Sequence, residues 1–318
     1  MIVATVTVPP VNALVTKLRA NLGAVIKGKP REIDFLILAL LGNGNVLLTD
    51  VPGVGKTTLA KSIAASLAGT FRRIQFTPDL LPADVLGGSI YSPRDGSFSF
   101  RKGPVFTNVL LADEINRASP RTQSALLEAM AEGQVSIEGE THQLPRPFWV
   151  VATQNPVEHH GTYPLPEAQL DRFALQLSMG YPPLEEELLV LSSQNKGHPL
   201  DGLAPVTAPE EVLATQEAVR QVHVDEDVSR YMLAIVRGTR EDRRLSLGTS
   251  PRGGIALYRM SQAHSFLAGR SNVTPDDVKA VAVETLAHRL LLETKAKYSG
   301  VTKEAVVKDV IDKSKVPV

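Results

Sequence analysis

The sequence lacks cysteine, has no net charge and contains no apolar run long enough to cross a membrane. Without cysteine there are no disulfides, no thiol catalysis and no cysteine-ligated metals, which is compatible with a reducing compartment. Lys plus Arg and Asp plus Glu each number 34, so the overall charge gives no reason to expect binding to nucleic acid or to an acidic membrane. A membrane span needs about 20 apolar residues, whereas the longest run, Phe35–Leu41, has the length of a buried helix. The apolar segment Met1–Val15 lacks a basic start and is interrupted by proline, so we expect a cytoplasmic protein without a signal peptide.

A strand, a glycine turn and a helix start follow one another between Asn45 and Ala60. Backbone N–H groups and a helix N-terminus arranged in this order surround an anion, which suits a phosphate chain. In such a loop the lysine reaches the β- and γ-phosphates and the following threonine holds Mg²⁺, the roles expected of Lys56 and Thr57. The residues expected to bind ATP through this loop are Gly53, Val54, Gly55, Lys56, Thr57 and Thr58.

One position departs from the phosphate-loop pattern, because Asp50 stands where the first glycine of G-x-x-x-x-G-K-T is expected. Aspartate tolerates turn conformations and can accept hydrogen bonds from nearby backbone. Its charge would repel phosphates at close range. We therefore expect the carboxylate of Asp50 to point away from the nucleotide.

Polar side chains follow two further apolar strands. Val109–Glu114 ends in two acids, and Phe148–Thr153 is followed by Gln154 and Asn155. ATP hydrolysis needs Mg²⁺, an oriented water and stabilisation of the developing charge. We expect Asp113 to hold the Mg²⁺ shell, Glu114 to polarise the attacking water and Asn155 to orient it. Taken singly, an acid pair can simply mark the exposed end of a strand, and asparagine is a common turn residue.

Strands alternate with helices up to about Pro183, which predicts a parallel sheet covered on both faces. Ligands bind at the carboxyl ends of the strands in such sheets, where the phosphate loop, the acid pair and Asn155 would meet. The remainder predicts helices, at about 184–194, 208–221, 225–237, 251–267 and 275–292. The expected fold class is therefore α/β, a P-loop αβα sandwich followed by an all-α domain.

Five motifs together resemble the MoxR family of AAA+ ATPases. They span residues 47–57, 110–118, 122–130, 152–156 and 161–173. Gly248–Arg252 and His288-Arg289 are similar to the C-terminal motifs of that family. The resemblance covers residues from about Lys27 to Leu291.

The resemblance implies a role for individual residues. Lys56 and Thr57 match Walker A, Asp113 and Glu114 match Walker B, and Asn155 matches sensor 1. Arg172 matches the arginine finger, which acts on ATP bound by a neighbouring subunit. Arg252 matches sensor 2, and Ile26 with Gly28 matches the segment that flanks the adenine. Without the family, Arg172 and Arg252 would be read as surface ion-pair residues. Arg117 is a rival for the role in the neighbouring site.

The resemblance also implies a domain organisation. It places the AAA+ nucleotide-binding core at residues 1–194 and a helical lid at 195–318. Within the core, residues 77–104 resemble the helix-2 insert of this clade and 134–147 its pre-sensor hairpin.

The function implied is an ATP hydrolase that forms a ring, a hexamer by family, and uses ATP and Mg²⁺ for chaperone-like remodelling or maturation of protein clients. A partner with a von Willebrand factor A domain is implied by family alone. The main alternative is a motor or loader acting on nucleic acid, for which Arg94, Arg101 and Lys102 are the best basic candidates. A third reading, a nucleotide-gated scaffold with negligible hydrolysis, is disfavoured by the combination of Glu114, Asn155 and Arg172.

Overall fold

A parallel sheet organises the first half of the chain. The computed structural model describes residues 11–50, 53–94, 96–137, 139–155, 162–193 and 199–317. Its main sheet has five strands in the order β2-β5-β8-β1-β9, and every pairing is parallel. The strands are β1 Val46–Thr49, β2 Phe71–Gln75, β5 Val109–Asp113, β8 Trp149–Gln154 and β9 Leu175–Leu177. This confirms the predicted α/β class and brings the carboxyl ends of all five strands to one edge.

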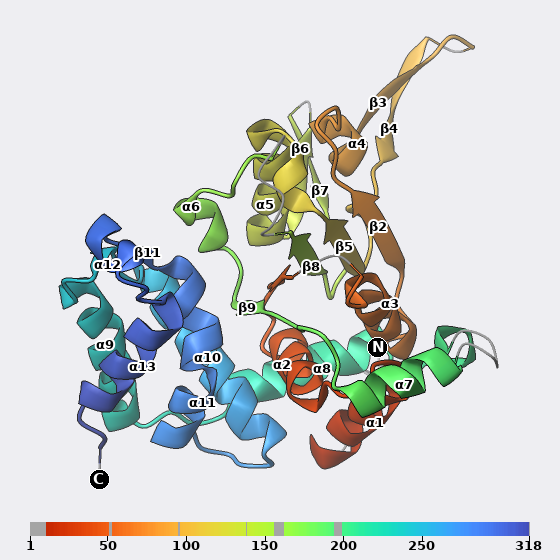
Figure 1. Ribbon diagram of the computed structural model, residues 1–318. Helices are drawn as coiled ribbons and strands as arrows, with labels where there is room; N and C mark the ends of the chain where they lie inside the picture. The colour runs from red at the N-terminus through yellow and green to blue at the C-terminus, as the bar shows by residue number, and fades with distance from the viewer. Residues whose placement is uncertain are drawn as a thin grey trace.

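Side chains alternate between two cores on the two faces of this sheet. Val46 and Leu48 of β1 belong to one apolar cluster, while Leu47 between them belongs to the other. The first cluster includes α1, α2 and α3, and the second includes α5 (Figure 1). These helices are α1 Val11–Val25, α2 Pro30–Leu41, α3 Lys56–Ser66 and α5 Pro120–Glu132. Because both faces are covered, the inner strands β1, β5 and β8 are buried along most of their length, whereas the edge strand β2 exposes Arg72 and Arg73.

Two hairpins form small sheets of their own, where the sequence predicts an insert and a second hairpin. The first follows the short helix α4, Pro82–Leu86, and pairs β3 Gly87–Ser92 with β4 Ser97–Lys102. It projects from the body of the molecule (Figure 1). The second pairs β6 Gln134–Ile137 with β7 Glu140–Gln143, and Glu138 of its predicted turn lies outside the described residues.

Helices dominate the rest of the chain, and those from residue 226 onward gather on the side away from the first hairpin (Figure 1). They include α6 Glu167–Leu170, α7 Leu184–Ser193, α8 Pro209–Arg220, α9 Glu226–Glu241, α10 Pro251–Leu267, α11 Pro275–Leu286, α12 Thr294–Tyr298 and α13 Lys303–Lys313. Single 3-10 turns occur at η1 Ile115–Arg117, η3 Pro199–Gly202 and η4 Ala287–Arg289. No helix in these described segments has the length and apolarity that a membrane span requires.

Two expectations for this half were wrong. The helix predicted over 275–292 ends at Leu286, and Leu291–Leu292 instead forms β11, which pairs antiparallel with β10, Leu245–Leu247. The predicted helix 225–237 continues to Glu241. The apolar residues at 286–292 fit either a helical or a strand pattern, and the partner strand β10 that decides between the two lies more than 40 residues earlier in the chain. The predicted domain boundary at 194/195 falls on residues outside the described ranges and stays a prediction.

Candidate nucleotide-binding site

The loop between β1 and α3 has the backbone of an anion-binding turn. Gly53 and Gly55 have positive φ angles of 87° and 89°, which glycine adopts without steric cost. Gly55 caps α3, which begins at Lys56. The first turn of α3 therefore directs its backbone N–H groups toward the carboxyl edge of the sheet. Thr57 and Thr58 lie half-buried in that turn.

Lys56 reaches back across the loop. Its Nζ donates to the backbone oxygen of Asp50 at 2.8 Å. Burial lowers the pKa of the Lys56 ammonium, and the negative charges of Asp50, Asp113 and Glu114 oppose that shift. An ammonium beside a helix N-terminus at the phosphate loop is placed to donate charge-assisted hydrogen bonds to a polyphosphate.

The carboxylate of Asp50 is directed to the end of β9. Oδ2 accepts from the backbone N–H groups of Met179 at 2.6 Å and Gly180 at 2.7 Å, and from the Ser178 hydroxyl at 3.2 Å. Asp50 is 7% exposed. The departure from the phosphate-loop pattern thus has a structural reason, because an aspartate at this position accepts hydrogen bonds from residues 178–180 and so positions the segment that follows β9.

One threonine of β8 contacts both Asp113, the last residue of β5, and Glu114, which follows it. Thr153 Oγ1 donates to Asp113 Oδ1 at 2.5 Å and accepts from the backbone N–H of Glu114 at 2.8 Å. Glu114 has φ 57° and ψ 49°, a left-handed conformation that is unusual for a residue other than glycine. Such strain persists where surrounding contacts enforce it, often at functional sites. The left-handed backbone points the Glu114 side chain in a different direction from the one it would take if β5 continued as a regular strand.

Strand β2 supplies two contacts that the sequence analysis missed. Arg73 donates to Asp113 Oδ2 through Nη2 at 2.7 Å and Nε at 3.1 Å. Gln75 Nε2 donates to Glu114 Oε2 at 2.7 Å, and the same oxygen accepts from Arg117 Nη1 at 3.0 Å. Arg73 and Gln75 share one face because strand side chains alternate. That alternation could be read from the sequence, but the pairing of β2 with β5 could not.

Asn155 lies just beyond the end of β8, and the segment Ile26–Gly28 follows α1. Asn155 follows β8 directly and is 5% exposed, and the preceding carbonyl of Gln154 accepts from Asp50 N at 3.2 Å. Ile26 is buried at the end of α1. Gly28 has φ +67°, and a Cβ there would lie 2.8 Å from Glu186 Cγ, so the segment packs closely against the start of α7.

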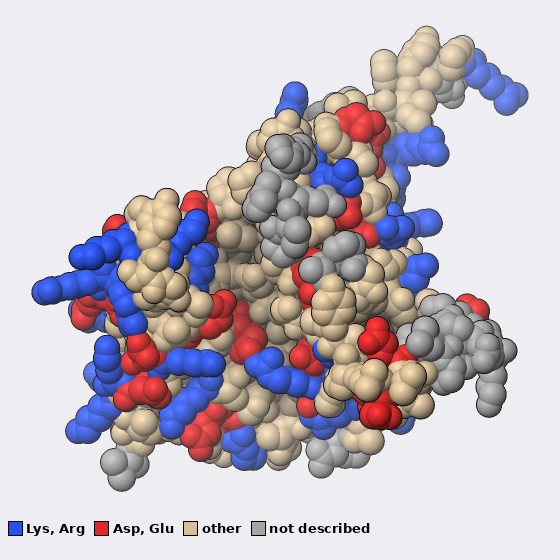
Figure 2. All heavy atoms as spheres, in the orientation of Figure 1, with Lys and Arg blue, Asp and Glu red and all other residues tan. Residues whose placement is uncertain are grey.

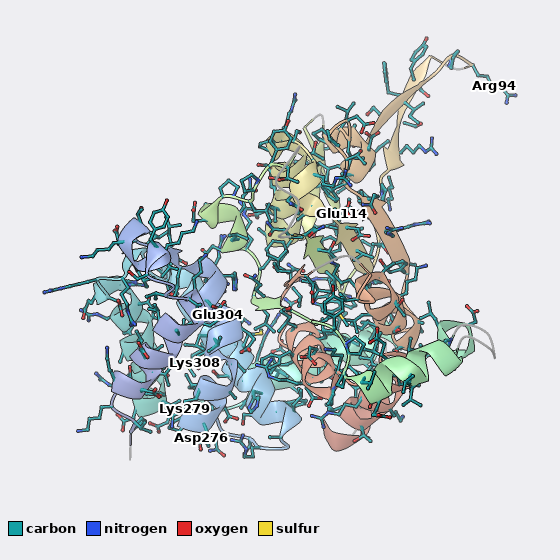
Figure 3. All side chains as sticks on the ribbon, viewed as in Figure 1. Arg94, Glu114, Asp276, Lys279, Glu304 and Lys308 are labelled. Carbon is teal, nitrogen blue, oxygen red and sulfur yellow. The ribbon has the colours of Figure 1, made fainter. Side chains whose placement is uncertain are left out.

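The two predicted arginines are not gathered at this edge. Arg172 Nη1 donates to the backbone oxygen of Leu127 in α5 at 2.5 Å. Arg252 is exposed on the first turn of α10. Arg117 instead contacts Glu114 of its own chain. Figure 3 places Glu114 within the sheet-containing part of the molecule, away from Arg94 at the tip of the hairpin.

The donor set fits Mg²⁺ bound together with a nucleotide. Within the described ranges, no group of three or more His, Asp or Glu side chains is arranged to hold a metal. Thr57 and Asp113 offer hydroxyl and carboxylate oxygens, which Mg²⁺ prefers, and Mg²⁺ commonly takes its other ligands from water and phosphate. These two residues would therefore hold the ion with help from a nucleotide.

Comparisons with known proteins agree with this fold and site. Residues 45–175 match the model of the ATPase family associated with various cellular activities (AAA), and 237–310 match an AAA lid domain. YeaC of Bacillus subtilis is 52% identical, with 96% of this chain and 95% of YeaC covered. Chaperone MoxR1 of Mycobacterium tuberculosis is 39% identical, with 92% and 80% covered. The crystal structure of a candidate ATPase from Cytophaga hutchinsonii superposes with a TM-score of 0.90 at 36% identity, with 97% and 96% covered.

The sheet, the phosphate loop and the strand-end acids define a P-loop AAA+ ATPase with a helical lid domain. More particularly, the chain belongs to the MoxR family of AAA+ ATPases. It is therefore a nucleotide-binding, ATP-hydrolysing enzyme.

Proposed function

We propose that this ATPase works as a ring in which each nucleotide lies at a seam between two subunits, and that hydrolysis drives chaperone-like remodelling or maturation of protein clients. The observation that carries the catalytic part is the meeting of Lys56, Asp113 and Glu114 at one sheet edge beside the N-terminus of α3. The client part rests on the similarity to a protein named a chaperone. A hexameric ring and a partner with a von Willebrand factor A domain remain proposals from the family.

Each residue has a distinct part in this proposal. Lys56 and the N–H groups of residues 53–58 bind the phosphates, and Thr57 with Asp113 holds Mg²⁺, which neutralises phosphate charge when bound. Glu114 accepts the proton of the attacking water, and Asn155 orients that water. Ile26 and Gly28 flank the adenine.

Two arginines that lie away from the carboxyl edge of the sheet would complete the site. Arg172 leaves Leu127 to reach the nucleotide of the neighbouring subunit, and Arg252 reaches the γ-phosphate from the lid. An arginine supplied by a neighbour makes hydrolysis depend on assembly. The core at 1–194 and the lid at 195–318 are the units whose relative movement would transmit force to a client.

The catalytic proposal is tested with Glu114→Gln. This change keeps the size of the side chain but removes the base, so turnover should fall by about 10²-fold or more while ATP binding is retained. Glu128→Gln on the exposed face of α5 is the matched control and should hydrolyse ATP normally. Turnover of the Glu114 variant near the wild-type rate would contradict the assigned role. A client trapped by the ATP-loaded Glu114 variant would then identify what the ring acts on.

The nucleic-acid alternative has one observation in its favour. Basic side chains follow the first hairpin and the edge of the sheet below it (Figure 2); they are Arg72, Arg73, Arg94, Arg101 and Lys102. The zero net charge of the chain weighs against it. Stimulation of the ATPase by DNA, declining steeply as salt increases, would support this alternative over the protein-remodelling proposal.

A further inference from the structure

A buried ion pair joins the segment that carries Arg172 to the C-terminal helices. Arg289, in η4, donates through Nε to Asp171 Oδ1 at 2.9 Å. The Arg289 side chain is 2% exposed and that of Asp171 is 17% exposed. Asp171 immediately precedes Arg172, so this pair lies one residue from the proposed finger.

Arg289 also binds the backbone on both sides of Arg172. Its Nη2 donates to the carbonyl oxygens of Phe173 at 2.6 Å and Asp171 at 3.3 Å, and its Nη1 donates to Ala174 O at 3.4 Å. Burial lowers the pKa of Arg289 to about 10, with Asp171 opposing the shift, so the guanidinium stays charged at neutral pH. One rigid, charged group from the C-terminal half therefore fixes the backbone of residues 171–174.

The same carboxylate is tied to α10, the helix that carries Arg252. Ser250, the N-cap of α10, lies 2.9 Å from each oxygen of Asp171, and its Oγ accepts from Gly253 N at 3.1 Å. A Cβ at Gly253 would lie 2.7 Å from Arg289 Cδ, so the absence of a side chain there lets Arg289 pack against the first turn of α10. Arg252 stands on that turn, and its charge contributes to lowering the pKa of Arg289.

We propose that Asp171 and Arg289 are positioning residues through which the lid of each subunit sets the place of the Arg172 that the same subunit presents to its neighbour. This rests on the proposed function, in which Arg172 acts in the neighbouring site. A movement of α10 on nucleotide binding displaces Ser250 and Arg289, and they displace the backbone of 171–174. Arg172 then loses its hydrogen bond to the Leu127 carbonyl when the lid moves. The nucleotide state of one subunit thereby controls hydrolysis in the next.

The test uses mixed rings with separate donors and acceptors of the finger. Glu114→Gln subunits bind ATP and donate Arg172 but do not hydrolyse ATP themselves, and Arg172→Ala subunits bind ATP but lack the finger. Equal amounts of the two variants form the reference mixture. Asp171→Asn, which keeps the volume but removes the charge, is then added to the donor alone or to the acceptor alone. Ser250→Ala is a second variant, which keeps the Asp171–Arg289 ion pair. It tests the same inference if Asp171→Asn fails to fold.

We expect each change to lower ATPase activity by about tenfold in the donor, as a small misplacement of a catalytic group does. In the acceptor, which has no finger to misplace, the loss should be less than about twofold. The matched control is Glu226→Gln, which removes an exposed ion pair with Arg230 in α9 and should have no effect on either side.

Equal losses in donor and acceptor would indicate a merely structural role and would overturn the inference, as would no loss in the donor. Both results leave the proposed function intact, because the reference mixture is active. An inactive reference mixture would contradict the action of Arg172 between subunits and would overturn the inference with it.

Discussion

Arg73 and Thr153 take the two oxygens of Asp113, with Arg73 Nη2 at 2.7 Å from Oδ2 and Thr153 Oγ1 at 2.5 Å from Oδ1. A guanidinium thus contacts the carboxylate that is proposed to hold the Mg²⁺ shell. Nearby, Gln75 donates to Glu114. Strand β2, at the edge of the sheet, therefore contacts both acids at the end of β5 and precedes the insert that contains α4 and the first hairpin.

The contact between Arg73 and Asp113 predicts competition with Mg²⁺. In Arg73→Ala, the Mg²⁺ concentration that gives half-maximal ATPase activity should fall by about threefold, because an exposed ion pair contributes under about 1 kcal/mol. Magnesium titration at saturating ATP measures this. Arg72→Ala is the matched control, since Arg72 lies on the opposite face of β2. An equal fall in that variant would show that general surface charge, and not the contact with Asp113, is responsible.

The hydroxyl of Thr153 joins the two acids. Thr153→Val keeps the shape but leaves Asp113 Oδ1 and the Glu114 N–H without this partner, so the free energy of unfolding should fall by about 2 kcal/mol. The turnover number should fall by roughly tenfold, because the left-handed backbone of Glu114 loses a contact that holds it. Urea unfolding and steady-state kinetics measure the two effects. Thr153→Ser restores the hydroxyl and should restore activity; failure to do so would assign the effect to packing.

The carboxylate of Asp50 predicts a loss of stability with little change in nucleotide binding. In Asp50→Asn, one of the acceptor oxygens is replaced by a donor, so the free energy of unfolding should fall by about 1–3 kcal/mol. Affinity for ADP should change by less than about threefold, equivalent to roughly 0.7 kcal/mol, because the carboxylate binds the end of β9. Titration calorimetry with ADP checks this. A much tighter complex would indicate that the wild-type charge faces the phosphates.

The buried His288 predicts a dependence of stability on pH. Burial lowers its pKa well below the ordinary value, and the adjacent charge of Arg289 acts in the same direction. The folded chain therefore keeps His288 neutral, whereas the unfolded chain takes up a proton below about pH 6.5. Below that pH the unfolded state binds more protons, so the free energy of unfolding falls as pH falls, by up to about 1.4 kcal/mol per unit.

This dependence is measured by urea unfolding of the wild type and of His288→Gln at several pH values. The variant should lose stability at neutral pH but show a shallower decline between about pH 6.5 and pH 5. His223→Gln, at an exposed position, is the matched control and should keep the wild-type slope. Parallel curves for the wild type and His288→Gln would exclude His288 as the titrating group.

Local chemistry in the sequence was enough to determine the phosphate loop, the strand-end acids and the sheet class. Gly53, Gly55 and Lys56 lie within four consecutive positions, and their conformations follow from residue type and from the helix α3 that begins at Lys56. The apolar runs of β5 and β8 likewise predict buried strands, because a sheet covered on both faces leaves no polar side. These features depend on neighbours within a few residues.

Only the tertiary structure decided which distant groups meet those acids. The pairing of β2 with β5 brings Arg73 to Asp113 across 40 residues, and Asp50 meets Met179 across 129 residues. Arg289 reaches Asp171 from the far end of the chain. The sequence carries no local mark of such contacts, because strand order and the placement of the C-terminal helices depend on how whole apolar faces pack. The phosphate loop and the strand-end acids could be predicted from residue type and spacing, but the side chains that contact them required the fold.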